Sequence, residues 1–493
     1  MLATGLPMPM CVVAQDLLRG GLLKEDVRYH VEAHGQTGES TPALYTHANR
    51  YGINSVNGHA SYLRAGITRD VLTDSARHWR MGYGVDVAGF IRHTSTWAIQ
   101  QAYVEVEYDW ARLTLGAKEH PLHLKHQRLS TGSFTLGKNS RPIPEIRLAI
   151  PNYLSLDKNN WVAVKGHVAF GVTTDGGFQK NYVAVGQHYV DKTCMHTKSG
   201  FLRLGNATKF PLTLEGGLEM AAQYGGTIYN LNQQGIKELN MSHGLKAMWH
   251  ALIPGGSDVT DEGYDNALGN TLGSWLLALN YHGKGWKARV YYDHFFEDHS
   301  QLFMEYNWKD GLWGVEIELP RNPMVNTMVY EHLNTKHQSG AVYHDHTTAL
   351  PDQISGRDNY YHHALYGSWS HWGQYVGNPL FITPLYRKDG RLRVTNNRFV
   401  AHHFGVSGQP FATLTYRVLA TWTTNWGTYD NLYEHKKSGQ HYLFELDYKP
   451  KFLGRKDVEG WSARLGVALD RGAHLGNNTT VMLTVGRSGN LFH

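Results

Sequence analysis

The sequence predicts an all-β fold, a transmembrane antiparallel β-barrel of about 18 strands with long extracellular loops. Three observations lead to this prediction. Apolar and polar residues alternate over many short segments, aromatic rings stand at the ends of the apolar rows, and short connections alternate with long ones. Together these features are typical of strands that cross a bilayer and close on themselves.

The alternation is clearest where tryptophan or tyrosine ends a row. An apolar row runs from Trp275 to Tyr281 at every second position, and similar rows begin at Trp286 and Trp461. These rings prefer the two membrane interfaces, so such a row matches a strand that spans the lipid.

The opposite rows are polar and fit a wet barrel lumen. They fit a solvated outer face as well, so a secreted all-β sandwich or propeller remains an alternative at this point. The charged members of these rows are Lys287, Arg289, Glu316, Glu318, Arg417, Glu445, Asp447, Arg464 and Asp470.

The composition of the 493 residues narrows the class of protein. There are 53 Gly, 29 Tyr and 14 Trp against 16 Pro, and the mean hydropathy is -0.43. No stretch approaches the roughly 18 apolar residues that a transmembrane helix requires. A membrane role therefore requires strands, which hydrocarbon accepts only as a closed barrel. The formal net charge of +5 is small for this length and indicates no nucleic-acid partner.

The first residues resemble the end of a signal peptide. A small residue, Ala14, precedes Gln15 where a signal peptidase would cut. We predict a residual signal peptide at 1–14, a short periplasmic segment at 15–25, and a single outer-membrane barrel at 26–493.

Alternating segments between turn residues give the candidate strands in order. They lie at 26–36, 60–69, 78–91, 98–107, 110–117, 142–150, 160–172, 198–205, 210–223, 272–281, 286–294, 312–319, 325–333, 398–407, 413–424, 441–449, 460–470 and 479–487.

The connections give the orientation of the strands. Tight connections are predicted at 206–209, 282–285, 320–323 and 409–411, and long ones at 225–271, 334–397 and 425–440. Outer-membrane barrels have short turns on the periplasmic side and long loops outside. We therefore assign 295–311 to an outside loop, which places both chain ends in the periplasm.

The residues that could carry metal or catalytic chemistry show no suitable spacing. His344, Asp345 and His346, with the His362–His363 and His402–His403 pairs, suggest metal ligands, but neighbours in an extended chain point in opposite directions. Glu215 and Glu219 would lie about 13 Å apart on one strand, too far for a glycosidase pair. The run Glu297–Asp298–His299 is equally nonspecific. We predict no catalytic residue, no metal and no cofactor.

One predicted loop has the composition of a glycan-binding surface, because rings stack on sugars while amide and cationic groups bind hydroxyls and carboxylates. An aromatic cluster that packs the loop or seals the barrel rim is an equal alternative. The candidate residues are Arg357, Asn359, Tyr360, Tyr361, Trp369, His371 and Trp372.

Several strings from about residue 100 to the C-terminus closely resemble Wzi-type capsule assembly proteins. The strings are GLEMAAQYGG from Gly217, IPGGSDV from Ile253, EDHSQ from Glu297, DQISGRDNYYHH from Asp352, GNPL from Gly377, AHHFGVSG from Ala401 and GTYDN from Gly427. The resemblance implies an eighteen-stranded outer-membrane barrel that attaches or organises capsular polysaccharide as a lectin and not as an enzyme.

The expected partners follow from this interpretation. They are capsular or related surface polysaccharide, outer-membrane lipid and lipopolysaccharide. The protein is expected to be a monomer in the outer membrane of a Gram-negative-type cell. The alternatives are a porin or solute channel, in which lumen charges select permeants, and a secreted carbohydrate-active enzyme.

Overall fold

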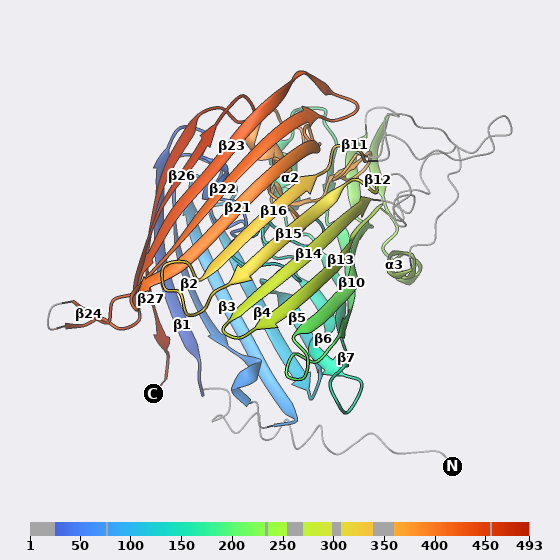
Figure 1. Ribbon diagram of the computed structural model, residues 1–493. Helices are drawn as coiled ribbons and strands as arrows, with labels where there is room; N and C mark the ends of the chain where they lie inside the picture. Colours follow the sequence, from blue (N-terminus) through green and yellow to red (C-terminus); the bar gives the residue numbers. More distant parts are fainter. Residues whose placement is uncertain are drawn as a thin grey trace, which may run out of the picture.

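The computed structural model describes residues 25–74, 77–231, 235–253, 270–297, 307–338, 359–453 and 456–492. Its main body is an 18-stranded antiparallel sheet (Figure 1). The sheet closes because the first strand pairs with the last, from Arg28 opposite Asn490 to Gly38 opposite Thr480. A closed sheet leaves no unpaired edge in lipid, and the predicted fold class is confirmed.

Each barrel strand pairs with the barrel strands that precede and follow it along the chain. The strands are β1 (Arg28–Gly38), β2 (Ala60–Arg69), β3 (Trp79–Ile91), β4 (Trp97–Tyr108), β5 (Ala111–Ala117), β6 (Glu145–Ser155), β7 (Val162–Val172), β9 (Cys194–Leu204), β10 (Leu212–Tyr224), β13 (Asn270–Gly283), β14 (Trp286–Glu297), β15 (Gly311–Glu318), β16 (Thr327–Asn334), β21 (Arg398–Phe411), β22 (Leu414–Gly427), β23 (Leu432–Tyr448), β26 (Trp461–Arg471) and β27 (Asn478–Asn490).

All the predicted segments overlap these strands, but two predicted connections are wrong. The long loop expected at 425–440 is a short link, because β22 ends at Gly427 and β23 begins at Leu432. The first half of β23 is polar on both faces and shows no alternation. Its sequence therefore predicts a loop, although the segment pairs with β22. The turn expected at 409–411 is instead the end of β21.

The two faces of the strands have the predicted character. On β13, Leu277 and Leu279 are each 47% exposed on the outside, whereas Leu276 and Ala278 are each 1% exposed on the inside. The barrel thus presents apolar side chains outward, as lipid requires.

Aromatic rings mark the end of the barrel at which β1 begins and β27 ends, here called the terminus end. The opposite end, which carries the longer connections, is called the loop end. The exposed rings at or next to the strand ends on the terminus side are Trp79, Tyr108, Trp161, Trp286, Tyr448 and Trp461. Such a girdle is typical of a membrane interface.

Small elements fill the connections. No helix among the described residues is long and apolar enough to cross a membrane. The predicted signal peptide at 1–14 and nearly all of the segment at 15–25 lie outside the described residues. The remaining elements are η1 (Leu44–Thr46), η2 (Val71–Asp74), α2 (Gly176–Tyr182), β8 (Tyr189–Asp191), β11 (Thr227–Leu231), β12 (Ile236–Asn240), α3 (Leu245–Leu252), β17 (His362–His363), β18 (Gly367–Ser368), β19 (Ser370–His371), β20 (Gln374–Tyr375), η6 (Pro384–Tyr386), β24 (Phe452–Leu453) and β25 (Lys456–Asp457).

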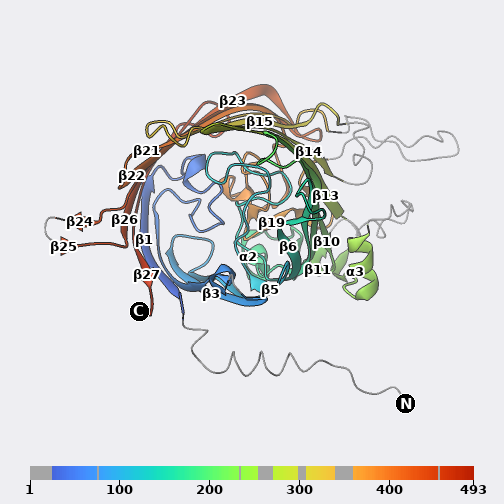
Figure 2. The same ribbon diagram turned by 60° about the horizontal axis from the view of Figure 1, so that its bottom comes forward.

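The largest apolar core lies inside the barrel. Figure 2 shows chain segments within the ring of strands, α2 and β19 among them. One cluster of buried apolar residues joins the connections at 39–59, 118–144 and 359–397 to the inner face of the wall. We call these three connections the plug. They fold inward because the lumen is where their apolar side chains can be buried away from water.

Candidate functional site in the lumen

The plug packs against the wall through aromatic rings. Phe295 on β14 lies between plug residues, with its ring centroid 4.6 Å from Tyr360 and 5.4 Å from Phe134. Tyr361 meets Phe381 edge-on at 4.3 Å. Edge-to-face pairs at these distances are the favoured geometry of buried rings. The interior at this level is therefore solid packing.

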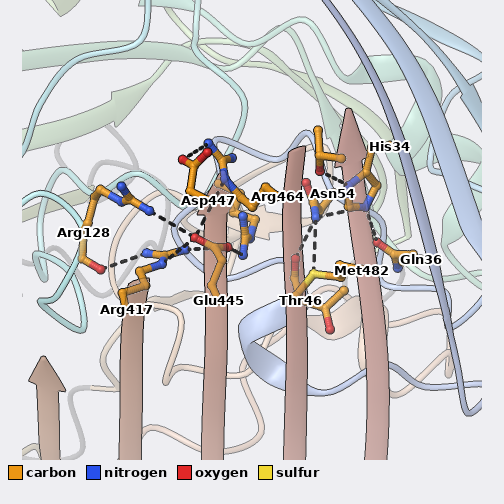
Figure 3. Close-up of polar contacts among 12 residues, drawn as sticks. His34, Gln36, Thr46, Asn54, Arg128, Arg417, Glu445, Asp447, Arg464 and Met482 are labelled. Atoms are coloured by element: carbon orange, nitrogen blue, oxygen red, sulfur yellow. Dashed lines mark hydrogen bonds and ion pairs between the residues drawn. The ribbon is translucent and has the colours of Figure 1, made fainter. Parts of the chain in front are cut away.

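Closer to the terminus end, a carboxylate on the wall binds the plug. Glu445 on β23 accepts from Arg128 at 3.1 Å and from Arg417 at 2.8 Å (Figure 3). It also accepts from Arg50 at 2.8 Å. Arg50 and Arg128 belong to the plug, and Arg417 belongs to β22. The Glu445 side chain is 2% exposed. This acid thus links two plug connections to the wall by charge-assisted hydrogen bonds.

The same cluster carries an excess of positive charge. Arg464 on β26 lies 3.2 Å from Asp447 and 3.9 Å from Glu445, so four guanidinium groups share two carboxylates. Removing Glu445 would leave Arg50 and Arg417, each 14% exposed, without this compensation.

A second carboxylate gathers donors from another part of the plug. Glu331 on β16 accepts from the Ser130 hydroxyl at 2.6 Å, the Thr131 amide at 2.7 Å and the Tyr291 hydroxyl at 2.6 Å. Glu331 is 0% exposed, so these donors replace the water that the ionised group would otherwise need.

Further polar contacts are spread around the wall. Lys125 pairs with Asp293, and both side chains are fully buried. The Leu44 amide donates to Asp470 at 3.0 Å. On the first strand, the Gln36 side chain donates to the Ser55 carbonyl at 3.1 Å. The plug is therefore fixed to several separate strands.

A polar chamber lies below the plug at the terminus end. Its cavity measures about 480 Å³ and is bounded by the terminus-side ends of six strands. Most of its charged groups are paired with one another: Arg289 with Glu316 at 3.4 Å, Lys287 with Glu318 at 3.4 Å, and the Tyr153 hydroxyl with Glu215 at 2.5 Å. Such a chamber can hold water and small solutes, but its polar groups already satisfy one another.

The structure buries most of the residues predicted to bind glycan. Tyr360, Tyr361 and Trp369 are 0% exposed and His371 is 1% exposed. Trp369 donates to Glu297 at 3.0 Å, and the Tyr361 amide donates to the same carboxylate at 2.6 Å. This arrangement corresponds to the packing alternative, because rings inside the plug core present no face to a ligand.

The rest of that set lies elsewhere. The Asn359 side chain donates to Asp430 at 2.8 Å and is only half-buried, and Trp372 is half-buried with the Arg141 guanidinium 4.7 Å from its ring. Arg357 lies outside the described residues. A glycan-binding role for the set stays a prediction.

The fold turns the neighbouring histidines His402 and His403 to opposite faces of the wall. His402 bonds Tyr330 at 2.9 Å, whereas its neighbour His403 points inward to the Leu129 carbonyl at 2.6 Å. Across the residues that the structure describes, no group of three or more His, Cys, Asp or Glu side chains could hold a metal ion. The residues 344–346 and 298–299 fall outside that part of the chain.

Sequence reasoning missed the plug connections at 39–59 and 118–144. Their polar residues show no periodicity, so Lys125 and Arg128 look like ordinary loop residues. One signal lies on the strands themselves. Asp293, Glu297 and Glu331 occupy inward-facing strand positions close to the loop end. A carboxylate at an inward position needs a partner that the wall alone does not supply.

We expect acid to loosen the plug before it affects the wall. Burial lowers the pKa of His47 and of His123 to about 3 and that of His126 to about 4, and it also lowers the pKa of His371. These groups stay neutral in the folded plug but titrate near 6.5 once released, so stability is complete above pH 6.5 and falls as the pH drops toward the folded values. For fully buried His47 the loss at pH 5 is about 2 kcal/mol.

Hydrogen–deuterium exchange at pH 7 and pH 5, corrected for intrinsic rates, measures this effect. Plug amides should lose protection at pH 5 while those of β22 and β23 keep it. Burial raises the pKa of Asp310 to about 7, and this single group acts against the trend set by the plug histidines. Equal protection of the plug at both pH values would contradict the expectation.

The closed strand order, the apolar outer face and the aromatic girdle define the fold of an outer-membrane β-barrel. No protein-family model matches the chain, and no curated protein matches it in sequence.

Solved structures do resemble it. One is Wzi, an outer membrane protein involved in group 1 capsule assembly in Escherichia coli and described as a carbohydrate-binding β-barrel, with a TM-score of 0.57 and 12% identity over 98% of this chain and 88% of that chain. OccAB2 of Acinetobacter baumannii gives a TM-score of 0.47 and 8% identity over 96% and 100% of the two chains. OprD of Pseudomonas aeruginosa gives 0.45 and 8% over 95% and 96%. At 12% identity the likeness to Wzi supports the fold alone.

Proposed function

We propose that this protein is a member of the Wzi-type capsule assembly family that binds capsular or related surface polysaccharide without enzymatic action. In this proposal it works as a monomer in the outer membrane of a Gram-negative-type cell, with both chain ends in the periplasm. The observation that carries the proposal is the plug. A lumen filled by buried ion pairs and packed rings suits a binding surface at the loop end better than a pore.

Three further observations support a glycan partner. The Wzi structure is described as a carbohydrate-binding barrel, and quoted strings of this sequence resemble that family. Exposed basic residues also occur in the last part of the plug, where Arg391 and Arg393 follow an exposed Lys388. Guanidinium groups suit the carboxylates and phosphates of acidic polysaccharides. Many weak contacts along a repeating polymer would retain it through effective concentration.

Gene deletion tests this function. Cells without the protein should release polysaccharide into the medium while the total amount synthesised stays constant, and the native gene should restore retention. A complementing Arg391→Glu, Arg393→Glu double variant should restore it less well, whereas Lys451→Glu, an exposed substitution on the terminus side, should restore it fully. Unchanged surface polysaccharide in the deletion strain would refute the capsule role.

The polar chamber of about 480 Å³ keeps a solute channel as a second candidate. Planar bilayer recordings separate the two functions, since a plugged barrel should show low conductance. A steady, large conductance of the native protein would favour the channel.

A further inference from the structure

Helix α3 lies outside the barrel, on the opposite side of the wall from the plug (Figure 2). It contacts β10 and β9. Its inner face is made of small residues, with Ala247 at 2% and Ala251 at 3% exposure, and these pack against Ala222 and Tyr224 of β10. Small residues let a helix approach a wall closely.

The covered wall residues belong to the outward row of β10. Leu214 lies on the same row, since side chains two residues apart share a face, and it is 46% exposed. Tyr224 is the last residue of β10 at the loop end. The helix therefore lies on the outer face of the barrel, near the loop-end limit of the apolar band.

The outer face of α3, together with Ile253 directly after the helix, forms an apolar stripe. Leu245 is 84% exposed, Trp249 59% and Ile253 51%, and residues four apart lie on one side of a helix. Lys246 and His250 are exposed next to the stripe. Large apolar side chains flanked by basic ones are typical of helices that lie in a membrane interface.

The strands beside the helix also carry apolar side chains on their outer face. Val172 on β7 and Leu202 on β9 are 41% and 42% exposed on neighbouring strands. The Lys198 ammonium on β9 donates to the Leu252 carbonyl, which holds the C-terminal end of the helix against the wall.

We propose that α3 is an interfacial helix embedded in the lipid leaflet at the loop end of the barrel. Leu245, Trp249 and Ile253 contact the acyl chains, and Lys246 and His250 face the phosphate groups of the lipid headgroups. The helix thereby sets the depth and tilt of the barrel on this side. The inference depends on the barrel fold and not on polysaccharide binding.

Spin labels measure the depth directly. A nitroxide is attached at Trp249→Cys in a Cys11→Ser, Cys194→Ala background, and the protein is reconstituted in vesicles of phosphatidylethanolamine and phosphatidylglycerol. Leu214→Cys serves as the lipid control and the exposed Glu434→Cys as the water control, and heat-modifiable gel mobility verifies folding of each variant.

The label at 249 should show a several-fold loss of collisions with a soluble nickel chelate relative to the label at 434, together with oxygen access close to that at 214. A label at Lys246→Cys should give an intermediate value. Nickel access at 249 equal to that at 434 would mean that α3 faces water, and the proposal would be overturned.

Discussion

Replacing Glu445 with alanine is expected to lower the free energy of unfolding by about 3–5 kcal/mol and to detach part of the plug. The carboxylate is buried and binds Arg50 and Arg128 of the plug as well as Arg417 of the wall. Without it, Arg50 and Arg417, whose side chains are each 14% exposed, would lose this carboxylate partner, and Arg464 would keep Asp447. Urea unfolding of the barrel in vesicles measures the loss.

Glu318→Ala is the matched control, because this acid also faces the lumen from a wall strand. Its partner Lys287 lies at 3.4 Å, but the two side chains are 56% and 37% exposed, so removal should cost less than about 1 kcal/mol. In planar bilayers the Glu445 variant should also show current bursts that the control lacks. Equal stability of the two variants would contradict the anchoring role of Glu445.

Trp369→Ala is expected to destabilise the protein by about 3–5 kcal/mol, because it empties the space of the largest fully buried side chain inside the plug. It also removes one of the donors to the buried Glu297 carboxylate. Trp369→Phe keeps most of the ring volume and loses only the donor, so we expect a smaller cost of about 1–3 kcal/mol. Thermal unfolding of both variants checks this order.

The same pair of variants tests the role first predicted for this ring. If Trp369 only packs the plug, polysaccharide affinity should follow the folded fraction in both variants. A Trp369→Ala protein as stable as the native one, but without polysaccharide binding, would instead show direct contact with the glycan.

The sequence by itself determined the barrel. Rows such as that from Trp275 to Tyr281 must alternate with polar rows wherever one face meets lipid and the other meets water, so this alternation, with the turn residues between segments, located the strands. It failed on the first half of β23, where both faces are polar and the alternation disappears.

The tertiary structure alone decided what fills the lumen. Tyr360, Tyr361 and Trp369 have the composition of a binding loop and also of a packed core, and only their inward folding distinguishes the two. Glu445 and Arg128 lie 317 positions apart in the chain, so no local pattern links them. Plug contacts of this kind depend on which connections enter the barrel, and that follows from the burial of the whole chain and not from the spacing of residues within any one segment.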